Sequence, residues 1–199
     1  MTFSRAFLDE STSILESIAD ADIESVVHIL QLTRDREGRL FFCGSGGGAG
    51  HSSHAACDFR KLAGIESYAV TDNVSELTAR INDEGWESSY ADWLRASRID
   101  ERDCVFVFSV GGGDESRGVS RNLVAAMRLA KSVGASLVGV VGRDGGELRR
   151  LADASILIPV QSPSTVTPQT EGLQALMWHL LVSHPSLARN AAKWESLTT

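Results

Sequence analysis

The chain has 199 residues and a formal net charge of −7, with 26 acidic and 19 basic residues. This length favours a single domain with a sizeable hydrophobic core. The acidic balance argues against nucleic acid or an anionic membrane as partner, because such surfaces are bound by clustered Lys and Arg.

The lack of recognisable targeting segments and the cysteine usage both favour a cytoplasmic protein. No apolar run is long enough to cross a bilayer, so we expect no membrane span. Residues 1–5 lack the apolar segment of a signal peptide. Cys43, Cys57 and Cys104 show no paired spacing, and two of them lie in apolar, strand-like runs. We therefore expect reduced thiols in a cytoplasmic protein.

The first 37 residues contain apolar residues at helical spacing, in two groups. The groups are Phe7, Ile14, Leu15 and Ile18, followed by Ile23, Val26, Val27, Ile29 and Leu30. This pattern predicts a helical hairpin over residues 1–37, with Asp20 or Asp22 capping its second helix. The wide apolar stripe suits packing on a second subunit, which would make the hairpin an oligomerisation element, and it equally suits plain core packing.

From residue 40 onward, short apolar runs alternate with helix-like segments. The runs are residues 40–43, 67–70, 104–109, 136–141 and 156–160, and the helical segments are 52–62, 74–81, 86–97, 120–133, 146–152 and 170–182. Such alternation predicts right-handed crossovers and a parallel sheet covered on both faces. The fold class is therefore α/β: a three-layer αβα sandwich with a five-stranded parallel sheet, preceded by the hairpin, in one domain over 1–199.

The most informative motif is the glycine-rich run at residues 44–50, which follows an apolar strand and leads into a helix. Such a turn presents free backbone N–H groups that can bind an anion. It matches neither a dinucleotide fingerprint, because no acidic ribose partner is evident, nor a P-loop, because it has no Lys. A purely structural glycine turn is the alternative interpretation.

A second glycine-rich loop spans residues 109–120. Its three consecutive glycines allow close backbone approach, and Ser109 and Ser120 offer hydroxyl groups. Ser120 also suits the N-cap of the following helix, and Arg117 has the geometry for a bidentate phosphate contact. Asp114 in the same loop would repel phosphate unless it points away. A flexible surface loop with one capping serine remains the alternative.

Two histidines and two carboxylates have spacings typical of metal or acid–base sites. His54 and Asp58 lie at i, i+4, and Glu171 precedes His179 by eight residues, so each pair shares one face of a helix. Such a set suits a divalent metal such as zinc, or a general acid and base. Each residue also has a plain interpretation: His179 as a core histidine, and Asp58 as a surface carboxylate facing basic residues 60 and 61. The metal hypothesis requires the two helices to meet.

The order of these motifs resembles the sugar isomerase (SIS) domain. The resemblance rests on residues 41–47 leading into His54 and Asp58, on the strand at 106–109 before a Gly/Ser loop, and on residues 141–146. Within that superfamily the chain is most similar to the phosphoheptose isomerases, which convert sedoheptulose 7-phosphate to glycero-manno-heptose 7-phosphate. The similarity covers most of the chain and implies a flavodoxin-like SIS fold.

The resemblance implies a role in substrate binding for ten residues. The family's phosphosugar loop falls on residues 44–48, its Asn-Asp pair on residues 82 and 83, and its phosphate-binding serines on the second glycine loop. The implied substrate-binding residues are Ser45, Gly46, Gly47, Asn82, Asp83, Ser109, Gly111, Gly112, Ser120 and Glu171. From its composition alone, the segment at 82–84 is equally typical of a solvated turn.

The resemblance also implies a metal and a quaternary structure. The family's metal-binding His falls on His54, its acid–base Glu on Asp58, its Gln on Glu171 and its C-terminal His on His179. Members are commonly homotetramers with sites at subunit boundaries, and several bind zinc. The expected metal ligands are therefore these four residues, and the expected assembly is a homo-oligomer.

The chain departs from the family pattern at several of these positions. The Glu-to-Asp change at Asp58 shortens its reach, and the Gln-to-Glu change at Glu171 adds charge. The family's Ser-Thr-Ser phosphate triplet is reduced at residues 109–111, and Gly48 replaces the serine that closes the first loop. These changes leave open that the substrate differs from the usual one.

Taken together, these residues predict a cytoplasmic phosphosugar aldose–ketose isomerase. Asp58 and His179 are the expected acid–base residues, with a divalent metal, zinc, held by His54, Asp58, Glu171 and His179. The alternatives are a non-catalytic phosphosugar-binding or assembly protein and an isomerase of a different phosphosugar.

Overall fold

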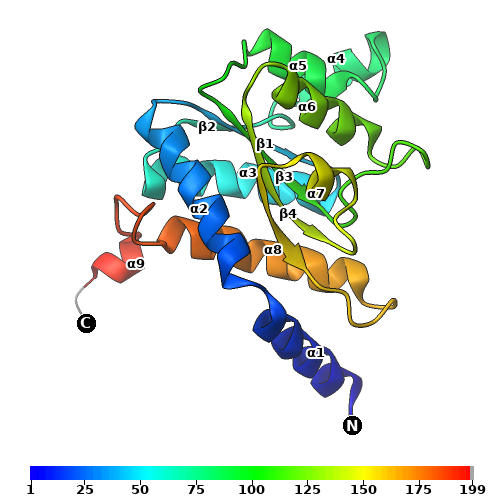
Figure 1. Cartoon of the computed structure of the whole chain (residues 1–199), viewed down its shortest axis with the longest axis vertical. Coiled ribbons are helices and arrows are strands. Elements are labelled where there is room, and N and C mark those ends of the chain that lie inside the picture. Colours follow the sequence, from blue (N-terminus) through cyan, green and yellow to red (C-terminus); the bar gives the residue numbers. More distant parts are fainter. Residues whose placement is uncertain (198–199) are drawn as a thin grey trace.

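The computed structural model of the protein describes residues 1–197 and shows a five-stranded parallel sheet between layers of helices (Figure 1). The strands are β1 (Leu40–Gly44), β2 (Ser67–Ala69), β3 (Cys104–Ser109), β4 (Ser136–Gly142) and β5 (Ala154–Ile158), in the order β2-β1-β3-β4-β5. The predicted α/β class and the five-stranded parallel sheet are confirmed.

The helices cover both faces of the sheet. They are α1 (Phe3–Ser17), α2 (Asp20–Asp35), α3 (Gly47–Asp58) with the π-helical turn η1 (Phe59–Ala63), α4 (Val74–Asp83), α5 (Ser89–Ala96), α6 (Arg121–Ser132), α7 (Gly146–Leu151), α8 (Val166–Ser183) and α9 (Lys193–Ser196). Helices α2, α3 and α8 pack on one face, and α5, α6 and α7 pack on the other. None of the helices in residues 1–197 combines the length and apolar character that a membrane crossing needs.

The core is divided in two by the sheet, as consecutive residues of β1 show. Phe41 faces the α5 side, where its ring centroid lies 5.8 Å from that of Trp93. Phe42 faces the α3 side, where it lies 5.4 Å from Phe59 and 5.2 Å from Phe106. Because both faces are buried, every position in the strand is apolar or small, which is why the central strands appear in the sequence as continuous apolar runs.

The N-terminal segment differs from the predicted hairpin in how its helices are placed. Both helices form, but Ile18 and Ala19 between them have extended backbone, with ψ angles of 130° and 119°. Figure 1 shows α2 lying along the sheet and α1 projecting beyond the body toward the start of α8. Polar contacts hold it there: the Ser11 hydroxyl donates to Gln169 at 2.8 Å, and that of Thr165 donates to Glu10 at 2.7 Å.

Most element boundaries lie close to those predicted, with two informative shifts. Strand β5 covers Ala154–Ile158 rather than 156–160, and Val160 is 39% exposed beyond its end. Helix α3 begins at Gly47, inside the glycine run, rather than at residue 52. The predicted single domain extends to residue 199, and residues 198 and 199 lie outside the described residues.

The register of the sheet brings three glycine-containing loops to one edge. Gly44 of β1 pairs with Phe108 of β3, and Ser109 pairs with Val141 of β4. The strands are parallel, so the loops that follow them emerge side by side at their carboxyl ends. Ligands of open α/β sheets bind at this edge.

Candidate active site

The first glycine loop is a tight turn that only glycine allows at several positions. Gly46 has a φ of +59°, and a Cβ on Gly44 would lie 2.2 Å from the Gly48 carbonyl. Tyr90 stabilises the turn, because its hydroxyl donates a 2.7 Å hydrogen bond to the Gly44 carbonyl. Burial raises the pKa of Tyr90 to about 12, so it remains a neutral donor. Asn122 donates to the Ser45 hydroxyl at 3.2 Å, which orients that side chain.

The second glycine loop is anchored to the loop after β4. The Ser109 hydroxyl accepts a 3.0 Å hydrogen bond from the Gly112 N–H, which closes the turn. A Cβ on Gly112, where φ is +75°, would lie 1.9 Å from the Gly145 carbonyl oxygen. The glycines therefore let two backbones touch, which anchors the first part of the loop, whereas residues 115–119 are exposed.

A cavity of about 290 Å³ lies between these loops. Five of the predicted substrate-binding residues line it: Ser45, Ser109, Gly111, Ser120 and Glu171. Three others, Gly46, Gly47 and Gly112, shape the adjacent turns without being among the lining residues. We call this space the loop cavity. Its lining is mainly apolar, but the hydroxyls of Ser45, Ser109 and Ser120 and the backbone N–H groups of the turns offer donors that suit an anion.

Ser120 does not act as predicted at the start of α6. It occupies the N-cap position, but its φ of +51° places it in the left-handed region, and its side chain makes no capping hydrogen bond. This backbone turns the residue toward the loop cavity, which it lines. The capping prediction is wrong because the preceding loop, with Gly118 at φ +69°, enters the helix from another direction.

Three further predicted residues lie away from the loop cavity. Asn82 and Asp83 end α4 on the surface, where the amide of Asn82 donates to Asp83 at 2.7 Å. Arg117 is ion-paired with Asp114 at 3.3 Å and its side chain is 74% exposed. Neither the Asn-Asp pair nor Arg117 is among the residues that line the loop cavity of this chain.

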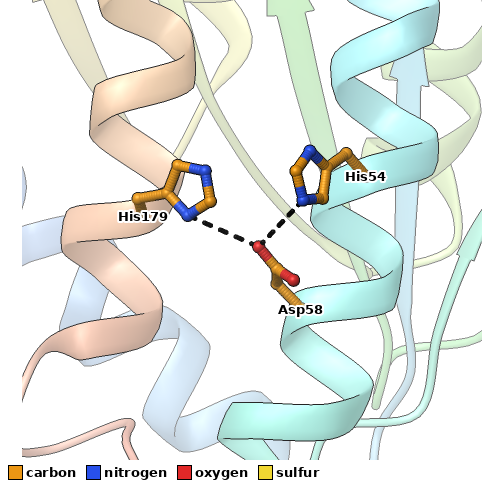
Figure 2. A group of neighbouring side chains, drawn as sticks. All are labelled: His54, Asp58 and His179. Atoms are coloured by element: carbon orange, nitrogen blue, oxygen red, sulfur yellow. Dashed lines mark ion pairs between the residues drawn. The ribbon is translucent and has the colours of Figure 1, made fainter. Parts of the chain in front are cut away.

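His54, Asp58 and His179 meet where α3 and α8 lie side by side. Figure 2 shows the two imidazoles directed toward one carboxylate oxygen. Asp58 Oδ2 lies 3.6 Å from His54 Nε2 and 3.5 Å from His179 Nδ1. The three ligand atoms all lie within 4.8 Å of one another. We call this group the His/Asp cluster. The structure therefore brings together three of the four predicted metal ligands.

The surroundings of the cluster fix its carboxylate and leave its imidazoles accessible. The Asp58 side chain is 13% exposed, whereas those of His54 and His179 are 58% and 51% exposed. The indole N–H of Trp178 lies 3.4 Å from Asp58 Oδ2 and orients it. A carboxylate held by a neighbouring donor, with two accessible imidazoles, is the arrangement found at catalytic metal sites.

The donor set fits a divalent metal ion. Ligand atoms about 2.0–2.1 Å from a tetrahedral zinc lie roughly 3.3 Å from each other. The two Asp58–imidazole separations of 3.6 and 3.5 Å are close to that value, and the two imidazole ligand atoms lie within 4.8 Å of each other. Imidazole nitrogen and carboxylate oxygen are both among the ligands that bind zinc in proteins.

The predicted fourth ligand, Glu171, is not part of the His/Asp cluster. It precedes His179 by eight residues, a rise of about 12 Å along α8. Its carboxylate lies against the start of α3 instead, where a Cβ on Gly47 would come within 2.5 Å of it. Glu171 thus belongs to the loop cavity.

His51 is a site residue that the sequence prediction treated only as a loop residue. It lies on α3 between the loop cavity and the cluster, with its ring centroid 5.0 Å from Trp178. Its Nε2 atom is buried without a hydrogen-bond partner among the described residues. Burial lowers the pKa of His51, and the nearby charge of Glu171 opposes that shift. The sequence feature that could have identified His51 is its spacing. His51, His54 and Asp58 lie at i, i+3 and i+7, which places them on one face of a helix.

Glycine loops at the carboxyl ends of a parallel sheet define an α/β domain that binds small ligands. The family model described as the SIS domain matches residues 6–142, which is more than half of the chain. The chain belongs to the SIS domain family.

Two relatives and one solved structure show what this chain is similar to. The lincomycin biosynthesis protein LmbN of Streptomyces lincolnensis is 35% identical over 191 residues, covering 90% of this chain and 68% of LmbN. A phosphoheptose isomerase of Helicobacter pylori (strain Shi470) is 30% identical over 172 residues, covering 84% of this chain and 83% of that protein. The structure of phosphoheptose isomerase GmhA from Neisseria gonorrhoeae matches with a TM-score of 0.77 and 23% identity, covering 90% of this chain and 95% of GmhA. That structural match establishes the fold.

Proposed function

We propose that the protein is a phosphosugar aldose–ketose isomerase that converts sedoheptulose 7-phosphate to D-glycero-D-manno-heptose 7-phosphate. The observation that carries the proposal is the His/Asp cluster on α3 and α8, next to a cavity built from glycine loops. Membership of the SIS domain family and similarity to the Helicobacter phosphoheptose isomerase support a phosphosugar isomerase.

The proposed chemistry is a proton transfer between C1 and C2 of the sugar. A base removes a proton from the carbon next to the carbonyl, an enediol forms, and an acid returns a proton to the neighbouring carbon. Asp58 and His179 take these roles in the proposal. Asp58 Oδ2 faces the imidazoles, and Oδ1 has no hydrogen-bond partner in the described part of the chain, which leaves it available to accept a proton.

A divalent metal, zinc in this proposal, would be held by His54 Nε2, Asp58 Oδ2 and His179 Nδ1. When bound there, such an ion polarises a carbonyl and stabilises negative charge on its oxygen. Trp178 keeps the carboxylate oriented, and the exposure of both imidazoles leaves the site open to substrate.

The separation of the two parts of the site supports a long substrate. Gly48 lines the loop cavity and His54 belongs to the cluster, and the six residue steps from one to the other rise about 9 Å along α3. An extended seven-carbon sugar can place its phosphate among the glycine loops while its carbonyl end reaches the cluster. In this proposal Glu171, which lines the loop cavity and lies against the start of α3, contacts the sugar.

Two further elements of the proposal concern assembly and compartment. We expect a homotetramer, because α1 projects from the body with exposed apolar residues. We assign the reaction to the cytoplasm, because Cys43 and Cys104 are buried free thiols rather than disulfide partners.

The test is turnover of sedoheptulose 7-phosphate by the purified full chain, with and without a chelator. We expect isomerisation by the metal-replete protein, loss of activity with chelator, and at least a hundredfold lower turnover in His179→Gln with an unchanged melting temperature. His184→Gln is the matched control, because His184 has its own carboxylate partner, Glu24, at 3.4 Å. Full activity of a folded His179→Gln protein would contradict the assigned role.

A second candidate is an isomerase of a different phosphosugar, in antibiotic biosynthesis. The 35% identity to LmbN and the reduced serine content of the loop at residues 109–111 favour it. Assaying pentose, hexose and heptose phosphates side by side distinguishes the two candidates by their kcat/KM. If the metal-replete protein turns over none of them, the chain is a phosphosugar-binding rather than a catalytic SIS protein.

A further inference from the structure

Arg143 occupies an unusual backbone conformation at the mouth of the loop cavity. It directly follows β4, and its φ of +56° lies in the left-handed region. A residue with a side chain adopts this region only at an energetic cost, because its Cβ comes too close to the following carbonyl oxygen. Strain of this kind persists where the surrounding structure enforces it, and it concentrates at binding sites. A role of the Arg143 side chain in binding would explain why the chain keeps this backbone conformation there.

The backbone on both sides of Arg143 is held in place by the second glycine loop. The Gly142 N–H donates to the Val110 carbonyl at 3.2 Å, and the Leu148 N–H donates to the Gly112 carbonyl at 3.0 Å. A Cβ on Gly146 would lie 2.3 Å from the Gly111 carbonyl oxygen, so the two loops are in direct contact. The Arg143 backbone, and with it the direction of its Cα–Cβ bond, is thus held by two loops in direct contact.

Among the described residues, Arg143 is an exposed positive charge without an ion-pair partner, and it lines the loop cavity. Its side chain lines the cavity together with Ser109 and Ser120, and its Cδ would lie 3.5 Å from a Cβ on Gly111. Within residues 1–197, neither a hydrogen bond nor an ion pair engages it. It is also the only basic residue of the described chain that lines this cavity.

Other arginines near this edge of the sheet are already neutralised. Arg121 is paired with Glu87 at 2.6 Å, and Arg128 is paired with Glu115. The acidic residue of the loop cavity, Glu171, has its carboxylate against Gly47 of α3, on the side formed by the first glycine loop. An anion entering between the loops would therefore meet Arg143 as its available countercharge.

We propose that Arg143 binds the phosphate group of the substrate, as the charged partner of the Ser109 and Ser120 hydroxyls. This inference rests on the proposed function and adds to it a binding residue and a reason for specificity. A guanidinium forms bidentate, charge-assisted hydrogen bonds with a phosphate monoester. It compensates for the hydroxyls that the loop at residues 109–111 lacks, and it makes the cavity select phosphorylated over neutral sugars.

The test compares Arg143→Asn with Arg121→Asn in the full-length protein. Both changes remove one positive charge, and Asn tolerates a positive φ better than most residues. Inorganic phosphate is the first probe, with chloride at equal ionic strength as the salt control, and its affinity is measured by thermal shift and calorimetry. The second probe is the steady-state KM for the phosphosugar that the wild type turns over best.

We expect Arg143→Asn to weaken phosphate binding and to raise KM by about tenfold to a hundredfold, the loss typical of one charge-assisted hydrogen-bonded contact. Turnover at saturating substrate should stay within a fewfold of the wild type. Arg121→Asn should leave both affinities unchanged, and Arg143→Lys should lie in between, because Lys keeps the charge but not the bidentate geometry.

The phosphate measurement separates this inference from the proposed function, because it needs no turnover. Phosphate affinity that depends on Arg143 in a protein without isomerase activity would support the binding role and refute the reaction. Equal phosphate affinity of the Arg143→Asn and Arg121→Asn proteins, or a wild type that binds phosphate no better than chloride, would overturn the inference.

Discussion

At the residue scale, Asp58 connects the two helices that form the His/Asp cluster. Its Oδ2 atom is the common neighbour of His54, His179 and the Trp178 indole. The low exposure of this carboxylate means that its orientation is set by packing rather than by solvent.

The partly buried imidazole of His51 should make stability depend on pH. Burial lowers the pKa of His51 below its usual value near 6.5, despite the opposing charge of Glu171. The unfolded chain therefore binds this proton more readily than the folded one, and stability falls as pH falls through that range. In the presence of a chelator, lowering the pH from about 7.5 to 5.5 should lower the melting temperature less in His51→Gln than in the wild type.

The control for this measurement is His28→Gln, which removes an exposed imidazole from α2. Its pH profile should follow that of the wild type. Chelator is needed in every sample, because protonation of metal-binding histidines would otherwise add its own destabilisation. Parallel profiles for His51→Gln and the wild type would mean that the His51 environment is more hydrated than its burial implies.

At the element scale, the first turn of α3 determines how much room the Glu171 side chain has beside the loop cavity. Gly47 has ordinary helical surroundings apart from Glu171, whose carboxylate occupies the space that a Cβ would need. At Gly50, one turn later, a Cβ would have no atom within 4 Å. Ala at Gly50, inside α3, gains about 0.5–1 kcal/mol of helix propensity, and Ala at Gly47, the first residue of the helix, gains less. Only the change at Gly47 disturbs the loop cavity.

We therefore expect Gly50→Ala to raise the melting temperature slightly and to leave kinetics unchanged. Gly47→Ala should keep a melting temperature near that of the wild type, because the flexible end of Glu171 can move aside. Its kcat/KM should fall by about tenfold, since a displaced binding group loses a contact worth roughly one hydrogen bond. Identical kinetics of the two variants would show that the position of Glu171 is unimportant for the reaction.

The central elements could be predicted from sequence because burial on both faces leaves an unambiguous pattern. Strand β3 matches its prediction at 104–109, since all but its last residue are buried. Strand β5 lies at the sheet edge, where Ile156 and Ile158 are buried but Leu157 is partly exposed, so its pattern is weaker and its position was shifted by two residues.

The site was only partly predictable, for a related reason. The i, i+4 spacing of His54 and Asp58 follows from helix geometry alone. The meeting of His179 with them depends on how α8 packs on α3, which no local pattern encodes. The same is true of Glu171, which lies beside Gly47, and of Arg143, whose position depends on a left-handed backbone angle held by a neighbouring loop.

At the scale of the whole molecule, the feature that a single chain does not explain is the projecting helix α1. Its contacts with the start of α8 are mainly polar, and Phe3 and Leu8 are 78% and 53% exposed. On α8, Leu176 and Leu180 are 44% and 36% exposed and share one helix face. Isolated helices of this length are marginal in water without packing partners. A second copy of this chain, presenting the same surfaces, would supply such partners.

We therefore expect the protein to be a homo-oligomer in solution and Leu8→Glu to shift it toward smaller species, because a charge placed in an apolar contact is costly to bury. Light scattering coupled to size-exclusion chromatography measures the mass directly. The matched control is Val74→Glu, which introduces the same charge at another exposed apolar residue, on α4 at the opposite end of the molecule (Figure 1). Val74→Glu should keep the wild-type mass. A monomeric wild type, or equal masses for both variants, would mean that α1 is stabilised by its own contacts with α8 and that assembly does not use it.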